Sequence, residues 1–587
     1  MEGNSFSFAA LPLLAGITAA QLRCPVMKLL RWLPVIALAV CLFLGAWIWW
    51  NRPQRGDLAN YVPADALVYL ECNSLLGVMD AIAGTAAWKE LRPLEASGDL
   101  PNRWLTMVVS WTGIGPIRTV ILARAQLAGV MLDLGAKEEG ETLTIKPEAV
   151  LLLETHTGER RIRATVEETL KLFAEKSFRQ PTVKRTAVAG SEFMVWSEPT
   201  SDRQLVATID GTLVIVGNSE RAVKACVEVR RGQRPNLRSN PELQKMRQHF
   251  RAGDSLAFGF ISSSNAARLF SLGAPLLFGR APGDVRFDRI ISASASKVLA
   301  AVGWSSRPWS GGIEDRYVFS LQTPVVERLQ PQFRPIDKPI QVLDLLPEHF
   351  YSATIYRFEN PAGTWQLLET TLSSQLDTLS AILVTSLQKS ALTPYGIQDP
   401  DKFLNLVGPE LTTVRLTPDT ERSTLIADVR DEVSLRQLLL GAGERNHKRI
   451  SAGQSEIFEL PDKSIAVSFL GGRVLIGPSD DIKLHLQDGN NPSQRNKNLD
   501  HFLNRSESAN VVTYTEDSDR IMEFVRAVVS ADGRNALPAE YNEYSRKTRM
   551  FPYAATETNL TAEGFERITR SSFGQFATLV PLLFPEQ

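Results

Sequence analysis

Two stretches of this chain follow one pattern: RQLVATIDGTLVIVGNSERAVKACVEV at residues 203–229 and KSIAVSFLGGRVLIGPSDDIKLHL at residues 463–486. In each, apolar and polar residues alternate up to a turn pair, Asp-Gly at 210–211 or Gly-Gly at 471–472. Alternation is typical of a half-buried strand, and residues that tolerate positive φ are typical of a tight hairpin. A continuously apolar second strand follows both turns. The sequence therefore predicts the same β-hairpin twice.

A helix is predicted after each hairpin. Ser219 and Ser479 are placed to cap the helix N-termini, and acidic residues follow each serine where they oppose the helix dipole. Apolar residues four positions apart then mark a buried helix face. These matched pairs are Ala222 with Cys226 and Ile482 with Leu486.

The match extends well beyond the hairpin and helix. Three further blocks occur in the same order: VPADALVYL at Val62 with LPEHFYSATI at Leu346, NPELQKM at Asn240 with NLDHFL at Asn498, and GGIEDRYVFSL at Gly311 with EGFERITRSSF at Glu563. Four ordered blocks are too many for chance, so the sequence predicts an internal duplication.

The predicted domain organisation follows from these blocks. Repeat A covers 61–321 and repeat B covers 341–587, and the proline-containing segment 322–340 is expected to be an extended linker. The predicted fold class is α+β: an N-terminal transmembrane helix followed by two duplicated α+β repeats with antiparallel sheets.

Two longer helices are predicted from apolar periodicity. Val166, Leu170 and Phe173 mark one in repeat A. The other, in repeat B, is apolar over more than one face between Leu367 and Leu387. It is expected either to be buried between a sheet and its neighbour or to line a cavity for a lipid or another apolar ligand. Its marker residues are Leu367, Leu368, Leu372, Leu376, Leu379, Ile382, Leu383, Val384 and Leu387.

Leu33 to Trp50 is predicted to be a membrane anchor. Its 18 residues carry no charge, and as a helix they would span about 27 Å, close to the hydrocarbon thickness of a bilayer. Tryptophans cluster at its far end, as in an interfacial aromatic belt. No good cleavage site follows, so an uncleaved anchor is favoured over a signal peptide.

The N-terminal segment 1–32 is predicted to be cytoplasmic, and the bulk of the chain to lie outside the cytoplasm. The difference in basic residues across the span is slight, so this orientation rests mainly on the short N-terminus. MKLLRW, which begins at Met27, is itself a good positively charged start. We therefore hypothesise that Met27, and not Met1, is the true first residue.

The anchor, VPADALVYLEC at Val62, IDGTLVIVGNSERAVKA at Ile209 and RSSFG at Arg570 together resemble an uncharacterised bacterial family. Its members are single-span extracytoplasmic proteins described as domains of unknown function. The resemblance implies a location in the bacterial cytoplasmic (inner) membrane and the architecture given above. It supplies no catalytic residues.

Composition and motifs argue against several classes of function. The 587 residues include 64 basic and 65 acidic residues, a net charge of −1 that is unlike the basic excess of nucleic-acid-binding proteins. None of the six histidines has HxH or HExxH spacing, and P-loop, EF-hand and GxSxG motifs are absent from the sequence. No catalytic, cofactor-binding or metal-binding residue is predicted.

The remaining charged and sulfur-containing residues are expected to be structural. Glu314 and Asp315 are adjacent, so on a strand they would point to opposite faces, and a surface role is expected for both. Cys72 and Cys226 could form a disulfide, although Cys226 aligns with an apolar residue and suits a buried thiol. A basic cluster after the repeat A helix is expected either to be solvated or to touch anionic headgroups or an acidic partner. Its members are Arg230, Arg231, Arg234 and Arg238.

The sequence therefore favours a membrane-anchored extracytoplasmic protein that acts as a non-catalytic scaffold or interaction module. Its expected partners are the lipid bilayer, through Leu33 to Trp50, and an envelope protein or lipid. The alternatives are a carrier or sensor of an apolar ligand and an enzyme without a local motif. The enzyme would require clustered carboxylates or a Ser/His pair with perturbed pKa values.

Overall fold

In the computed structural model, Gly56–Gln587 form one compact unit. The described residues are 55–91, 125–139, 142–188, 190–269, 297–334, 336, 338–375, 391–419, 422–441, 447–452, 455–460, 465–488, 508–531, 538–551 and 553–583. The predicted anchor at 33–50 and the alternative start at Met27 lie outside them. Among the described residues, no helix combines the length and apolar character needed to cross a membrane.

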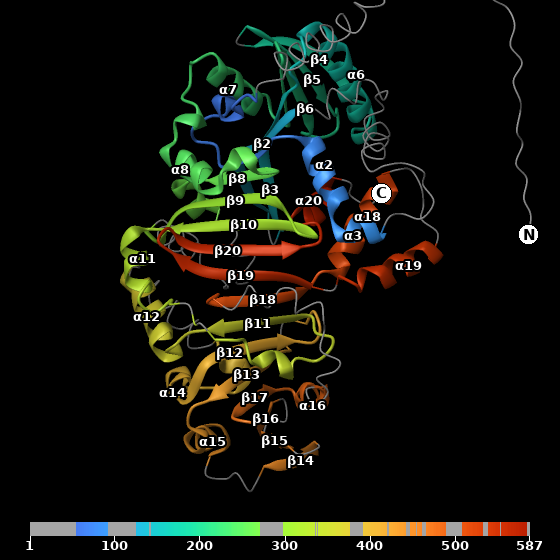
Figure 1. The fold of residues 1–587 in the computed structure, drawn as a ribbon. Helices are drawn as coiled ribbons and strands as arrows, with labels where there is room; N and C mark the ends of the chain where they lie inside the picture. Colours follow the sequence, from blue (N-terminus) through green and yellow to red (C-terminus); the bar gives the residue numbers. More distant parts are fainter. Residues whose placement is uncertain are drawn as a thin grey trace, which may run out of the picture. The chain divides into compact units, whose positions relative to one another are not determined.

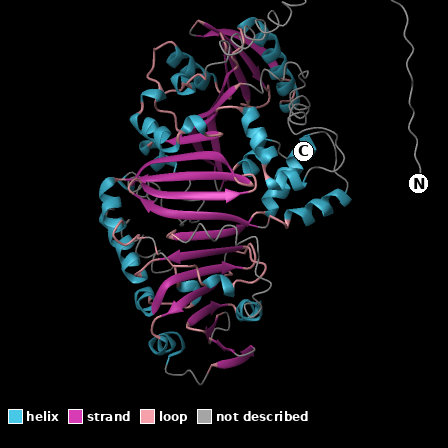
Figure 2. Ribbon diagram, in the orientation of Figure 1, coloured by secondary structure: helices cyan, strands magenta, loops and turns pink. Residues whose placement is uncertain are grey.

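Within residues 56–587 the fold is α+β, built on a 20-stranded antiparallel sheet (Figures 1 and 2). The strands between residues 68 and 321, which we call the first half, are β1 (Val68–Cys72), β2 (Gln126–Glu139), β3 (Thr142–Glu154), β4 (Thr182–Val188), β5 (Ser191–Ser197), β6 (Gln204–Asp210), β7 (Leu213–Gly217), β8 (Ala257–Ile261), β9 (Leu299–Trp309) and β10 (Gly312–Leu321). Those between residues 352 and 571, the second half, are β11 (Ser352–Arg357), β12 (Val407–Arg415), β13 (Thr424–Val429), β14 (Lys448–Ala452), β15 (Ser455–Glu459), β16 (Ala466–Leu470), β17 (Arg473–Gly477), β18 (Val511–Glu516), β19 (Tyr553–Thr561) and β20 (Gly564–Ser571).

The two halves have the same strand order. Outward from the middle of the sheet, the first half runs β10-β9-β8-β1-β2-β3-β7-β6-β5-β4. The second half runs β20-β19-β18-β11-β12-β13-β17-β16-β15-β14. β10 pairs with β20, so one continuous sheet passes through both halves.

The register at the middle strands relates the halves by an approximate two-fold rotation. Arg316 on β10 lies directly opposite Ile568 on β20. These two residues also occupy the same position in the aligned GGIEDRYVFSL and EGFERITRSSF blocks. A two-fold axis perpendicular to the sheet therefore passes close to this pair, and it leaves equivalent residues of the two halves on the same sheet face.

The predicted hairpins form as expected. β6 and β7 join through Gly211 with φ of +66°, and β16 and β17 join through Gly471 and Gly472, also at positive φ. The Oγ of Ser219 accepts a hydrogen bond from the Ala222 amide at 3.4 Å and caps the next helix. The predicted cap at Ser479 is wrong by one residue.

The helix of the second half begins at Ser479 itself. The carbonyl of Pro478 accepts the first helical hydrogen bond, from the Ile482 amide at 3.0 Å, so Pro478 takes the capping position. A proline has no side-chain acceptor, so it leaves this helix without a side-chain cap.

The helices lie on both faces of the sheet. In chain order the α-helices are α2 (Leu75–Gly84), α3 (Ala86–Leu91), α6 (Glu159–Ser177), α7 (Glu220–Arg230), α8 (Pro241–Phe250), α11 (Thr323–Leu329), α12 (Pro361–Gln375), α14 (Pro400–Leu406), α15 (Glu432–Leu440), α16 (Ser479–Asp488), α18 (Ser518–Ala531), α19 (Pro538–Thr548) and α20 (Phe576–Leu583). The 3₁₀-helices are η1 (Leu58–Tyr61), η2 (Leu237–Ser239), η3 (Ala252–Asp254), η4 (Val342–Leu345) and η5 (Thr393–Tyr395).

One sheet face carries matching cores in the two halves. In the first half, η1, α7 and α8 pack on this face around Val223, Phe250 and Phe258. In the second half, η4 and α16 pack on it around Ile482 and Tyr514. We call this the first face. These apolar layers hold the strands in register, because a slip of one residue would turn them to the other face.

The opposite face, here called the second face, carries four further cores. α6 covers the outer strands of the first half, and α14 and α15 cover those of the second. Over the middle strands the helices form two groups. One group consists of α2, α3, α18 and α20, packed around Phe573. The other consists of α11 and α12, packed around Phe333 and Phe565. Figure 1 shows the two groups at opposite ends of β9, β10, β20 and β19.

The segment 322–340 differs from the prediction. Instead of being extended throughout, it contains the two-turn helix α11, whose Val325, Val326 and Leu329 are buried. Pro324 lies in the first turn of the helix and Pro331 lies just after its end, where a proline does not interrupt helical hydrogen bonds. The prolines therefore delimit a helix here.

The predicted helices agree in part with the structure. α6 covers Val166, Leu170 and Phe173 as expected. α12 begins at Pro361 and is described to Gln375, and Leu367 and Leu368 pack in the core that α12 shares with α11. The side chain of Leu372, and Leu376, Leu379, Ile382, Leu383, Val384 and Leu387, lie outside the described residues.

Candidate functional site

Five threonines form a row across the second face of the second half. Cross-strand neighbours share a face, so the strand register alone places them side by side. From β12 to β20 the row reads Thr413, Thr354, Thr513, Thr556, Thr569. Each threonine lies on a different strand, and neighbouring strands are about 4.8 Å apart. We call these residues the threonine row.

The hydroxyls of the row are linked to one another. The Oγ of Thr513 donates to that of Thr354 at 3.2 Å, and the hydroxyls of Thr556 and Thr569 lie 3.0 Å apart. Thr556 is 6% exposed and the other four are half-buried. Each hydroxyl has two acceptor lone pairs and one proton, so a linked pair keeps capacity for further hydrogen bonds.

Aromatic residues lie beside the row on the same face. Tyr356 follows Thr354 by two residues on β11 and is 37% exposed. Burial raises the pKa of Tyr356, and a hydrogen bond with Thr413 partly offsets this. Tyr317 lies opposite Arg567 across the β10–β20 pair, and burial raises its pKa too. Both phenols therefore stay protonated at neutral pH and can donate hydrogen bonds.

Two arginines lie on opposite sides of the row. Arg567 precedes Thr569 by two residues on β20, and its side chain is exposed. Arg415 follows Thr413 by two residues on β12, donates from Nε to the Ser352 hydroxyl at 3.0 Å and lies 5.3 Å over the Tyr351 ring. Neither has an ion-pair partner among the described residues.

The equivalent row of the first half has a different chemistry. The same strand positions, β2 to β10, read Gly129, Leu70, Gly259, Trp304, Tyr317. Leu70 is 38% exposed, and a side chain at Gly259 would meet Leu70 and Trp304 within 3.1 Å. The same topology is therefore compatible with an apolar row, and the sheet itself does not require threonines.

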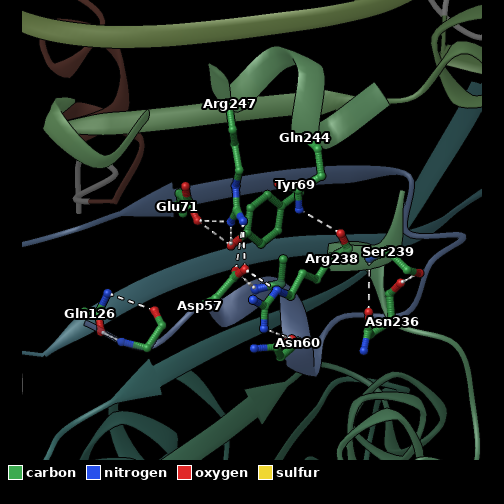
Figure 3. A network of polar contacts seen from close by, with 12 residues as sticks. Asp57, Asn60, Tyr69, Glu71, Gln126, Asn236, Arg238, Ser239, Gln244 and Arg247 are labelled. Atoms are coloured by element: carbon green, nitrogen blue, oxygen red, sulfur yellow. Dashed lines mark hydrogen bonds and ion pairs between the residues drawn. The ribbon is translucent and has the colours of Figure 1, made fainter. Parts of the chain in front are cut away.

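A second polar group, on the first face of the first half, is held together by ion pairs within the chain (Figure 3). Arg247 of α8 donates to both carboxylate oxygens of Asp57 at 3.0 Å and to Glu71 on β1 at 2.7 Å. Tyr69 donates to the same Glu71 at 2.6 Å. Burial alone would lower the pKa of Arg247, but the charges of Glu71 and Asp57 raise it. The group ties η1, β1 and α8 together.

Two carboxyls are buried where the halves meet. Asp315 of β10 accepts hydrogen bonds from Trp304 Nε1 at 2.9 Å and the Gln575 amide at 2.8 Å. Asp517 lies 3.1 Å from Arg520, which also donates to the Gly574 carbonyl at 3.0 Å. Burial raises the pKa of each carboxyl to about 6. Both are 1% exposed, so neither is open to a substrate.

This cluster corrects the expectation for Glu314 and Asp315. They point to opposite faces as predicted, but neither is a surface residue. Glu314 is half-buried and pairs with Arg570 at 3.0 Å. Asp315 is covered by the loop after β20. In that loop Gly574 has φ of +58°, and a Cβ there would lie 2.5 Å from Asp315 Oδ2.

The arginines of the basic cluster after α7 form ion pairs and hydrogen bonds within the chain. Arg230 pairs with Asp210 at 2.9 Å and Arg234 with Asp65 at 2.7 Å. Arg231 donates to the Ser191 hydroxyl at 2.9 Å, and Arg238 lies 3.3 Å from Asp57. These contacts fit a structural role for the cluster.

The histidines and cysteines also have structural surroundings. His249 of α8 lies 3.1 Å from Glu563 and 3.5 Å from Glu566, across the boundary between the halves. A hydrogen bond with Glu566 raises the pKa of His249, although burial opposes this. Cys72 and Cys226 are free thiols, and Cys226 is fully buried. Among the described residues, no three potential metal ligands come together.

Sequence reasoning missed the threonine row. Its members are spread from Thr354 to Thr569 and share no motif, because strands that are adjacent in the sheet are far apart in the chain. The sequence feature that could have indicated the row is threonine at alternate positions of a strand, as in VVTYTED at 511–517 and ATETNLT at 555–561.

Comparison of the chain with protein-family models, curated proteins and solved structures finds no match.

Proposed function

We propose that this chain is an extracytoplasmic interaction module, anchored in the bacterial cytoplasmic membrane and built from two duplicated α+β repeats, 61–321 and 341–587. Repeat B binds the partner on its threonine row. The observation that carries the proposal is the row itself: five hydroxyls in register on a partly accessible sheet face.

The duplication is supported by the common strand order and by the pairing of Arg316 with Ile568 near the two-fold axis. When a fold is duplicated, one copy can keep a structural role while the other copy acquires a binding role. The first half carries the ion-pair group around Arg247, and the second half carries the row. Localisation in the proposal rests on the uncharged stretch from Leu33 to Trp50.

The alternatives have less support. For an apolar-ligand carrier, Leu367 and Leu368 would need to line a cavity, but they pack in the core shared by α11 and α12. For an enzyme, Asp315 and Asp517 have the expected raised pKa values. Both are held by groups of the chain itself, away from solvent, as in a structural cluster.

The test is purification of the full chain from its own membranes in mild detergent, with identification of bound molecules. The variant is Thr354→Val with Thr513→Val. Valine keeps the branched shape, and removing both members of a hydrogen-bonded pair costs little stability. The matched control is Thr182→Val with Ser197→Ala, which removes another cross-strand hydroxyl pair, 3.0 Å apart, in the first half.

We expect a stoichiometric partner with the wild type and the control, and its loss with the Thr354/Thr513 variant. The unfolding temperatures of the three proteins should agree within a few degrees. A partner that remains bound to the variant would overturn the proposed surface. A wild-type protein that carries no partner would overturn the interaction module.

A further inference from the structure

The charges on the second face of the middle strands are unbalanced. On the strands from β9 through β10, β20, β19, β18 and β11 to β12, the carboxyl and guanidinium groups of this face are those of Asp315, Arg415 and Arg567. Asp315 is buried beneath the loop that contains Gln575. The accessible charge is therefore that of the two arginines, and it favours an anionic ligand.

The arginines mark a diagonal across the threonine row. Arg567 lies on one side of the row at β20, and Arg415 lies on the other side at β12. Four strand spacings and four residues along the strands separate them, which gives roughly 20–25 Å. A ligand that reaches both must be extended and must carry anionic groups at intervals.

The surface between the arginines selects the chemistry of the ligand. Hydroxyls recur at each strand, and the partly exposed Tyr356 offers a ring face and a protonated phenol. A protein partner would usually bring an apolar hot spot, which needs an apolar pocket at the centre of the contact. Here the centre is the hydroxyl pair of Thr513 and Thr354. A sugar chain has hydroxyls that can hydrogen-bond to the threonine hydroxyls. The C–H faces of its rings can pack on the Tyr356 ring.

We propose that the threonine row binds a carboxylate-bearing polysaccharide, with sugar hydroxyls on the threonines and carboxylates on Arg415 and Arg567. This rests on the proposed function and names its ligand class. The first half supports it by contrast, because Arg415 and Arg567 are replaced there by Met131 and Asp315 at the equivalent positions. The guanidinium fork suits carboxylates, which a lysine would bind less specifically.

The experiment measures binding of the purified full chain to oligomers of galacturonate, mannuronate and hyaluronate. The methyl ester of the first and neutral dextran are the uncharged probes. The variants are Arg567→Gln and Arg415→Gln. The matched control is Arg160→Gln, an exposed arginine of α6 with no ion-pair partner among the described residues.

At least one acidic oligomer should bind, its affinity should fall with added salt, and the uncharged probes should bind at least tenfold more weakly. Arg567→Gln and Arg415→Gln should each weaken binding of the acidic oligomer about five- to tenfold, and Arg160→Gln should leave it unchanged. Equal binding of acid and ester, or unchanged binding by both variants, would overturn the ligand class. So would the absence of binding to all three acids. The proposed function would survive that result if the native partner still required Thr354 and Thr513.

Discussion

The two halves of this protein share a strand order and differ in where they place polar groups. In the first half, Tyr69 and Glu71 of β1 point to the first face and join the ion-pair group of Arg247. In the second half, the equivalent residues of β11 are Ala353 and Ile355, which lie in an apolar core. On the second face the difference is reversed, because the second half carries the threonine row and the first half carries Leu70 and two glycines.

The sheet therefore tolerates either chemistry on either face. Strand order and register depend on the apolar layers common to both halves. A polar group present in only one half therefore serves either the local stability of that half or a function specific to it.

The largest expected effect is the loss of the ion-pair group in the first half. Arg247→Gln removes the cation that Asp57 and Glu71 share in a mostly buried site, and leaves Asp57 with the more exposed Arg238. The substitution should reduce the free energy of unfolding by about 3 kcal/mol. Adding Glu71→Ile, the second-half residue, should recover part of this loss. Chemical denaturation of the three proteins checks both statements.

The control for that series is Arg221→Gln, which removes an ion pair at an exposed site. Arg221 is 69% exposed and pairs with Asp133 and Glu148, so its loss should cost less than 1 kcal/mol. If Arg247→Gln proved as mild as this control, the group would not be holding η1, β1 and α8 together.

The loop after β20 should give the next effect. Gly574→Ala places a Cβ at positive φ and 2.5 Å from Asp315 Oδ2, and should destabilise the protein by about 2 kcal/mol. The equivalent first-half residue, Gln322, has φ of −61°. Gln322→Ala should therefore cost well under 1 kcal/mol. Equal effects in thermal unfolding would show that the two loops are under the same constraint.

A smaller, pH-dependent effect should come from Asp315. Burial raises its pKa from 3.8 to about 6, so the stability linked to its protonation is fully present below pH 3.8 and is lost as the pH rises through about 6. Trp304, Ser306, Gln575 and Arg520 oppose the shift. Asp315→Asn stays neutral. Its stability relative to wild type should therefore improve by about 1 kcal/mol between pH 5 and pH 8.

Unfolding free energies at the two pH values measure this change. The control is Asp519→Asn, at an exposed residue of α18, and its difference from wild type should not vary with pH. A constant difference for Asp315→Asn as well would show that Asp315 is ionised to the same extent in the folded and unfolded chains.

Local patterns predicted much of the fold. The hairpins at 204–217 and 466–477, the helix α7 and its Ser219 cap all depend on residues close together in the chain. The same is true of the free, buried Cys226. The offset of α16 by one residue, and the helix α11 in the segment expected to be extended, arose because a proline can begin or follow a helix as well as prevent one.

Features that depend on strand adjacency could not be predicted in this way. Alternation shows which residues of β10 share a face, but not that β20 is its neighbour. Asp315 was therefore expected at the surface, and its burial beneath Gln575 was missed. The threonine row has the same origin, because Thr354 and Thr513 are neighbours only through the order β18-β11.

Under the proposed function, the second half provides the binding surface. This proposal is tested most directly by hydrogen–deuterium exchange of the full chain, compared with and without the partner expected to copurify under the proposed function. With the partner bound, exchange should slow in β18, β11 and β12 and stay unchanged in the equivalent strands β8, β1 and β2. Protection confined to the first half, or no difference in either half, would contradict the proposal.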